Sequence, residues 1–242
     1  MEPPAILSAG PPKSAADGPM EAGRRVLVTG ASGGAGPGVL SAFLEAGWRV
    51  VGVSRRDPPT GPDGVTWVRA DLGGAEAAEQ MVAEAVAELG GLDALVCLAG
   101  GYSSTPLHEL AWRDFDRQIA TSLRPTVEAV LAALPELRRA GAGSIVTIGS
   151  QTASKPGGSV GPYAAAKAAV ATWSLALAAG LRASGVRVNC VLPGTIDTEA
   201  NRESMPDAKR DSWVSPRQLG ELIVYLCSPA SRPLTGTQIP IG

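Results

Sequence analysis

Hydrophobic residues in this chain fall into short continuous runs that alternate with longer amphipathic stretches. The short runs are rich in Val, Ile and Leu, as is typical of strands buried on both faces. They predict strands at 24–28, 48–53, 65–68, 93–98, 144–148, 186–192 and 237–241. The stretches between them predict helices at 39–46, 75–89, 112–139, 160–182 and 216–227, with a loop over 193–215. This alternation indicates an α/β fold: one Rossmann-type, doubly wound parallel sheet in a three-layer α/β/α arrangement.

Two prolines lie inside the longest predicted helix, 112–139. Pro125 and Pro135 are each expected to interrupt it, because proline lacks an N–H and its ring crowds the carbonyl four residues earlier. We expect Pro125 in particular to kink the helix and to free the carbonyl of Thr121.

The composition suits one domain preceded by a tail. The chain has 242 residues, a net charge of -2 and 45% hydrophobic residues. Residues 1–22 are rich in Pro, Ala and Gly, so we interpret them as a disordered tail and 23–242 as one catalytic domain. The near-neutral charge argues against nucleic acid as a partner, and no apolar run is long enough to predict a membrane span. Three well-separated cysteines, without a CxxC pair, favour reduced thiols in a cytoplasmic protein.

A glycine-rich turn separates the first strand from the first helix, with the pattern Thr29-Gly30-x-x-x-Gly34-x-Gly36. Glycine lets the backbone approach a pyrophosphate, and the helix N-terminus supplies amide donors. A purely structural turn is the alternative. The position in the first strand-helix-strand unit favours a dinucleotide site, with contacts expected from Gly30, Ser32, Gly34, Ala35 and Gly36.

The residues that follow the second and third strands bear on the choice of cofactor. An acidic residue after the second strand would hold the ribose 2′-hydroxyl, whereas arginine favours a 2′-phosphate. This sequence has Ser54 and Arg55 there, so we expect NADP(H) to be favoured over NAD(H). A pair of solvated arginines is the alternative. Asp71 and Leu72 end the third strand and are expected to border the adenine, although Asp71 could equally cap a helix.

Three polar residues around the predicted helix 160–182 form a candidate catalytic group. Tyr163 and Lys167 are four apart and therefore share one helix face, and Ser150 follows the preceding strand. We expect the Lys167 charge to lower the pKa of the Tyr163 phenol from its usual value of about 10. A packed tyrosine beside a surface-reaching lysine is the alternative. His108 is the only histidine, so neither a Ser-His-Asp triad nor a multi-histidine metal site can be assembled, and no metal site is expected.

Taken together and in this order, these motifs resemble the short-chain dehydrogenase/reductase family over residues 24–242. Pro193-Gly194-x-x-x-Thr198 matches the family segment that touches the nicotinamide end of the cofactor. The resemblance implies hydride transfer between NADP(H) and a small-molecule carbonyl, with Tyr163 as general acid/base and Ser150 holding the substrate oxygen. It also implies a homodimer or homotetramer built through helices 112–139 and 160–182. Cofactor contacts are implied for Tyr163, Lys167, Ala99, Gly100, Pro193, Gly194, Ile196 and Thr198.

The sequence also departs from the family pattern. Cys97-Leu98 stands where the family has two asparagines, and Ser122 takes the place of its fourth catalytic residue, an Asn that helps hold a water in a proton path. Three segments, 97–101, 120–122 and especially 197–213, resemble the dihydropteridine reductases, which makes a pterin reductase an alternative function. A catalytically silent dinucleotide sensor is a third interpretation. Further residues that could line the substrate pocket are Tyr102, Ser103, Arg202, Met205 and Trp213.

Overall fold

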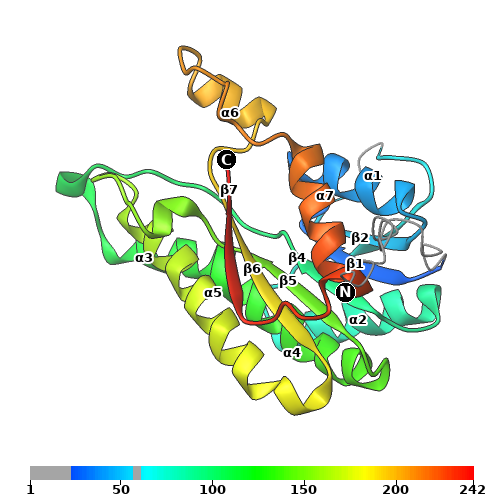
Figure 1. Ribbon diagram of the computed structural model, residues 1–242. Coiled ribbons are helices and arrows are strands. Elements are labelled where there is room, and N and C mark those ends of the chain that lie inside the picture. The colour runs from blue at the N-terminus through cyan, green and yellow to red at the C-terminus, as the bar shows by residue number, and fades with distance from the viewer. Residues whose placement is uncertain (1–22, 57–60) are drawn as a thin grey trace, which may run out of the picture.

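The apolar runs of the sequence form seven parallel strands in a single sheet (Figure 1). The computed structural model describes residues 23–56 and 61–242, so the predicted tail 1–22 lies outside the described residues. The strand order is β3-β2-β1-β4-β5-β6-β7, which confirms the doubly wound topology. The strands are β1 Arg25–Thr29, β2 Arg49–Ser54, β3 Val65–Arg69, β4 Ala94–Cys97, β5 Ser144–Ile148, β6 Arg187–Pro193 and β7 Thr237–Ile241.

The helices follow the predicted alternation, with one addition. They are α1 Gly36–Glu45, α2 Ala75–Leu89, α3 Trp112–Gln118, α4 Arg124–Arg139, α5 Gly161–Gly180, α6 Glu199–Ser204 and α7 Pro216–Cys227. The additional helix is α6, within a segment that the sequence predicts as loop. Its six residues carry no apolar repeat, and the Thr198 hydroxyl caps it by accepting a hydrogen bond from the backbone N–H of Asn201 at 3.3 Å.

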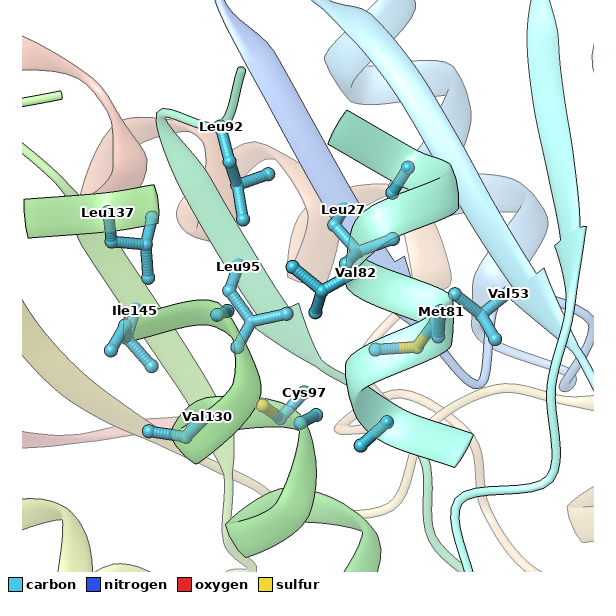
Figure 2. Packing of buried hydrophobic residues seen from close by; sticks show 14 of the residues in the cluster. Leu27, Val53, Met81, Val82, Leu92, Leu95, Cys97, Val130, Leu137 and Ile145 are labelled. Carbon is cyan, nitrogen blue, oxygen red and sulfur yellow. The ribbon is translucent and has the colours of Figure 1, made fainter. Parts of the chain in front are cut away.

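Each face of the sheet packs against its own set of helices. On one face, α1 and α7 cover β1 and β4 through residues such as Phe43 and Ile223. On the other face, α2, α4 and the end of α5 bury a second cluster. Figure 2 shows Val82 of α2 beside Leu95 of β4, and Met81 of α2 beside Val53 of β2, in this second cluster. Burial on both faces explains why the strands appear as continuous apolar runs in the sequence.

The long helix predicted at 112–139 is irregular in the middle and regular at its end. A π-helical turn, Ile119–Leu123, separates α3 from α4, so the predicted disturbance near Pro125 is confirmed. The hydroxyls of Thr121 and Thr126 donate to carbonyls four residues earlier, a pattern that bends helices. The predicted interruption at Pro135 is wrong: α4 runs through it. Residues on either side, including Leu137, are fully buried in the core, and their packing outweighs one lost backbone hydrogen bond.

The strand order places a crevice at the centre of the sheet. β1 lies between β2 and β4. From β1 the sheet grows in one direction through β2 and β3, and in the opposite direction from β4 to β7. Connections that leave adjacent strands toward opposite faces open a crevice at their carboxyl ends, where ligands bind in such folds. The predicted glycine turn follows β1, and the segment Ala99–Gly100 follows β4, so both predicted cofactor segments meet there.

Candidate active site

The glycine turn is shaped by the close approach of two backbone segments. Gly30 has a φ of +67°, and a Cβ added there would lie 2.5 Å from the backbone N and Cα of Ala99. A Cβ at Gly36 would lie 1.8 Å from the carbonyl oxygen of Ala31. The Thr29 hydroxyl accepts a hydrogen bond from the N–H of Ala99 at 3.4 Å, which joins the ends of β1 and β4. Only glycine fits these two positions, because any side chain would separate the segments.

A cavity of about 690 Å³ runs along the carboxyl ends of the strands. This volume is in the range of small-molecule and cofactor sites. Nearly all the residues predicted to contact a cofactor line it, from six separate segments of the chain: Gly30, Ser32, Gly34, Ala35, Ser54, Arg55, Asp71, Leu72, Ala99, Gly100, Tyr163, Lys167, Pro193, Gly194, Ile196 and Thr198. Three predicted site residues, Gly36, Ser122 and Ser150, do not line it. Gly36 packs against Ala31, so its contribution is to the shape of the turn.

One corner of the cavity combines hydroxyls with arginines. Ser54 is buried, and its hydroxyl donates to the hydroxyl of Ser32 at 3.1 Å while accepting from the N–H of Arg56 at 3.3 Å. The side chains of Arg55 and Arg56 are exposed on the rim. Asp71 lies on the same cavity wall, after β3. This corner therefore offers hydrogen-bond donors and positive charge to an anion.

Tyr163 and Lys167 project from α5 into the cavity at the end of β5. Lys167 is buried, and its ammonium donates to the carbonyl oxygen of Ile148 at 2.9 Å. Burial lowers the pKa of Lys167 to about 8. Ser150 is also buried, and its hydroxyl accepts from the N–H of Thr152 at 3.2 Å, which caps a short 3₁₀ turn. Ser150 lies directly after the lining residue Gly149, and it is close enough to Tyr163 to influence its titration.

The pKa of Tyr163 is opposite in direction to the one the sequence predicts. Burial raises the pKa of the phenol, the nearby Ser150 hydroxyl acts to lower it, and Tyr102 acts to raise it. The net shift is upward because loss of hydration disfavours the phenolate more than its surroundings stabilise it. The expectation that Lys167 leaves the phenol with a lowered pKa is therefore wrong for this structure.

Ser122 occupies the π-helical turn, next to Lys167. Its side chain is completely buried, and its hydroxyl has no hydrogen-bond partner among the described residues. A Cβ added at Gly100 would lie 3.1 Å from the Lys167 ammonium and 3.7 Å from the Ser122 hydroxyl, so both groups approach the same glycine. Buried hydroxyls are nearly always hydrogen-bonded, which marks this position as one with unused donor and acceptor capacity.

Several residues around the cavity carry no signal in the sequence. Arg56, Thr121 and Asn201 line it without being predicted to do so, and Gln118 supports the loop after β4 from a buried position. Tyr102, which the sequence leaves open as a pocket residue, lines the cavity. Four other pocket candidates do not line it: Ser103, Arg202, Met205 and Trp213. Only the position of Asn201, within the cap motif of α6, gives a hint that sequence reasoning could have used.

His108 lies outside the cavity. It is exposed in the 3₁₀ turn Leu107–Glu109, with its Nε2 atom 3.3 Å from the Glu109 carboxylate. In residues 23–56 and 61–242, no three His, Cys, Asp or Glu side chains gather as a metal site would require. Over the same part of the chain, no helix combines the length and apolar character needed to cross a membrane. The three cysteines, Cys97, Cys190 and Cys227, are free and buried.

Comparison with known proteins gives consistent matches over most of the chain. A family model described as short chain dehydrogenase matches residues 24–209. The chain is 32% identical to the L-fucose dehydrogenase of Oryctolagus cuniculus, over 89% of this chain and 83% of that protein. It is 31% identical to the cis-4-hydroxycyclohexanecarboxylate dehydrogenase of Sinomonas cyclohexanicum, over 90% and 94%. The crystal structure of 3-ketoacyl-(acyl-carrier-protein) reductase from Brucella melitensis complexed with NADH matches with a TM-score of 0.80 and 25% identity, over 90% and 96%.

Proposed function

The chain belongs to the short-chain dehydrogenase family and is an NAD(P)-dependent oxidoreductase, and within that family we propose that it reduces a small-molecule carbonyl with NADPH. The observation that carries the proposal is the grouping of Tyr163 and Lys167 in one cavity with the glycine turn, with Ser150 beside them. A silent dinucleotide sensor has no chemical need for these three side chains.

Each of the three residues has a role that its surroundings support. When bound, the nicotinamide supplies a hydride to the carbonyl carbon. Tyr163 donates its phenolic proton to the carbonyl oxygen, so that the product is an alcohol. Ser150 donates a hydrogen bond to the same oxygen as charge develops on it. Lys167, fixed by the Ile148 carbonyl, holds the nicotinamide ribose and keeps a positive charge beside the proton donor.

Ser122 takes part in returning the proton to Tyr163. Its buried hydroxyl lacks a partner among the described residues and approaches Gly100 from the same side as the Lys167 ammonium. A water that bridges the two groups would satisfy the Ser122 hydroxyl and would connect Lys167 to a proton path. This assignment gives a shorter side chain the place that an asparagine has in the family.

The preference for NADPH rests on the corner formed by Ser32, Ser54 and Arg55. A 2′-phosphate needs donors and positive charge, and the Ser32 hydroxyl, which accepts from Ser54, and the exposed Arg55 guanidinium supply both. The Brucella reductase was crystallised with NADH, so membership of the family leaves this choice open. The arginine after β2 supports the phosphorylated cofactor.

The substrate is proposed to be a small organic carbonyl, since the relatives reported above are named as dehydrogenases of L-fucose and of a hydroxycyclohexanecarboxylate. The likeness of residues 197–213 to dihydropteridine reductases stays a prediction. A quinonoid pterin therefore belongs among the test substrates.

An assembly of identical subunits is part of the proposal. Large apolar side chains are exposed on α3, the π-helical turn, α4 and α5: Trp112, Ile119, Leu131 and Leu175. These are the two helical regions that the family resemblance assigns to subunit contacts. Exposed apolar side chains on neighbouring helices support such an interface, and light scattering on the purified protein measures whether a dimer or tetramer forms.

Consumption of NADPH in the presence of a panel of ketones and a quinonoid pterin tests the function directly. We expect turnover with a ketone, and we expect Tyr163→Phe to lower kcat by about 10²- to 10⁴-fold, the usual contribution of a positioned proton donor. Binding of NADPH, measured separately, should be unchanged in this variant. Tyr225→Phe is the matched control, because Tyr225 is exposed on α7 away from the cavity.

Two outcomes would contradict the proposal. Wild-type activity in Tyr163→Phe would remove the assigned proton donor. Tight NADPH binding without oxidation by any carbonyl would favour the sensor interpretation, and turnover with the pterin alone would favour the pterin reductase.

A further inference from the structure

Tyr102 is an exposed aromatic residue next to the proposed proton donor. Its side chain is 63% exposed, whereas Tyr163 is largely enclosed. The two ring centroids are 5.1 Å apart, and the ring planes meet at 71°, an edge-to-face arrangement. Both residues line the cavity, so they form two adjoining walls of it. A carbonyl that reaches the Tyr163 hydroxyl therefore lies alongside the Tyr102 ring.

The backbone on both sides of Tyr102 is held by one buried side chain. Gln118, at the end of α3, is 2% exposed. In the amide orientation that satisfies both of its polar atoms, its nitrogen donates to the carbonyl of Gly101 at 2.9 Å. Its oxygen then accepts from the hydroxyl of Ser103 at 2.7 Å and from the backbone N–H of Ser103 at 3.3 Å. A single amide thus fixes the residues immediately before and after Tyr102.

A second set of contacts fixes the same loop farther along. The N–H of Thr105 donates to the carbonyl of Ser159 at 2.8 Å, which joins the loop to the segment leading into α5. The Thr105 hydroxyl donates to the buried carboxylate of Asp114 at 3.5 Å. The Tyr102 ring is therefore exposed to solvent although the backbone that carries it is tied to α3 and to the start of α5.

Exposure of an aromatic ring on a fixed backbone is the arrangement expected of a binding surface. The Tyr102 ring is exposed to solvent in the free protein and becomes buried when a ligand packs against it. Because the loop backbone is already held in place, little conformational entropy is lost on binding. Aromatic rings contact flat or cyclic partners over a large area at low conformational cost. A flexible open chain would lose rotational freedom on the same surface, so it gains less from the contact.

We infer that Tyr102 is a specificity-determining residue that favours a carbonyl carried on a ring over one in an open chain, and that Gln118 is the positioning residue that holds it there. This inference rests on the proposed carbonyl reductase function and deepens it. Because the two residues lie close together, Tyr102 acts to raise the pKa of Tyr163.

Two ketones with the same number of carbon atoms, cyclohexanone and 2-hexanone, test the inference. We expect Tyr102→Ala to lower kcat/KM for cyclohexanone by about 3- to 10-fold, mainly through KM, because one aromatic contact is lost. The value for 2-hexanone should change less than about twofold, and NADPH binding should not change. Tyr102→Phe keeps the ring and should keep the selectivity. Tyr225→Ala removes an exposed tyrosine elsewhere and is the matched control.

The role of Gln118 is separated from a general structural role by a double-mutant cycle. Gln118→Met keeps the length of the side chain and removes its hydrogen bonds, so it should reduce the ratio of the two kcat/KM values as Tyr102→Ala does. The double variant should lose no further selectivity, because both changes act on one contact. An additive loss would overturn the positioning role of Gln118.

The outcomes distinguish this inference from the function on which it rests. Suppose that the wild-type protein reduces ketones and that Tyr102→Ala leaves the ratio of kcat/KM for cyclohexanone to kcat/KM for 2-hexanone unchanged, or lowers the two kcat/KM values equally. The specificity role of Tyr102 is then wrong, and the proposed reductase function is unaffected. If the wild-type protein oxidises NADPH with no ketone at all, the proposed function is wrong, and the inference falls with it.

Discussion

The two halves of the crevice achieve binding by different physical means. The cofactor half, at the ends of β1, β2 and β3, is built from backbone and glycine, and its shape depends on the absence of side chains at Gly30 and Gly36. The catalytic half, at the ends of β4 and β5 and on α5, depends on side chains whose properties are set by burial, as at Tyr163 and Lys167. A phosphate is recognised by many amide donors and by charge, whereas proton transfer needs a few groups with adjusted pKa values. Substitutions should therefore affect the two halves in different ways.

The largest effect of a substitution is expected at Gly36, where two backbone segments of the cofactor half are in contact. Gly36→Ala places a Cβ 1.8 Å from the carbonyl oxygen of Ala31, so the turn between β1 and α1 must move. We expect the free energy of unfolding to fall by about 3 kcal/mol, the upper range for an overpacked site, with loss of nucleotide binding. Denaturant titration measures the free energy of unfolding, and calorimetry measures nucleotide binding.

Gly73→Ala is the matched control for this change. Gly73 lies in an exposed loop after β3, and a Cβ there would meet no atom within 4 Å. The free energy of unfolding should stay within about 0.5 kcal/mol of the wild-type value. Equal stability of the two variants would show that the close contact at Gly36 does not shape the turn.

The next largest effect is expected at Lys167 in the catalytic half, where the free energy of unfolding depends on pH. Burial lowers the pKa of Lys167 to about 8 in the folded protein, from 10.5. Below pH 8 both the folded and the unfolded chain carry this proton, so the full cost of burying the charge is present. Between pH 8 and 10.5 the folded form has released the proton and the unfolded form keeps it, so stability rises with pH. Relative to Lys167→Met, the wild-type free energy of unfolding should gain on the order of 2 kcal/mol across this window.

Comparison with Lys167→Met cancels the titration of groups that Lys167 does not influence, and leaves that of Lys167 and of the buried thiols of Cys97 and Cys190, which interact with it. Lys209→Met, which replaces an exposed lysine, is the matched control. A difference between wild type and Lys167→Met that stays flat from pH 8 to 10.5, or falls, would contradict the assigned burial of the ammonium.

These two predictions also mark what the sequence can and cannot establish. The glycine turn and the bounds of α2 and α7 are predictable because they depend on local properties: the need for glycine, the apolar repeat and Pro216 in a first turn. The pKa of Tyr163 is not, because it depends on how much water the folded chain excludes. Tyr163 lines the cavity, as the sequence predicts, but the direction of its pKa shift is opposite to the predicted one.

Tertiary contacts account for the other differences. Local grounds predict that Pro135 interrupts the helix 112–139, but buried neighbours keep α4 continuous. Gln118 has no recognisable motif, since its role exists only once the loop after β4 folds over it. Helix α6 was missed because one capping residue is its only signal. Sequence reasoning is therefore strongest in the cofactor half and weakest where side chains from distant segments meet.

A smaller effect is expected at the charged corner of the cofactor half. Arg55→Ala removes one guanidinium from the rim beside Ser54. We expect the dissociation constant for NADPH to rise about tenfold, because one charge-assisted contact to a 2′-phosphate is lost, and that for NADH to stay the same. Fluorescence titration with each cofactor measures the ratio of the two dissociation constants. An equal rise of both dissociation constants, or no rise in either, would show that Arg55 does not contact the 2′-phosphate. Arg232→Ala, which removes an exposed arginine outside the cavity, is the control.

The smallest effect on stability, and the most informative about the catalytic half, is expected at Ser122. Its hydroxyl is buried without a partner among the described residues, so Ser122→Ala removes no protein hydrogen bond. We expect the free energy of unfolding to change by less than about 1 kcal/mol, because no protein hydrogen bond is lost. If a water bridges Ser122 and Lys167, kcat should nevertheless fall while NADPH binding stays constant, and Ser122→Asn should restore part of the rate. A stable Ser122→Ala variant with wild-type kcat would mean that the proton path bypasses this residue, whereas a slow and stable one would separate the chemistry of the catalytic half from its packing.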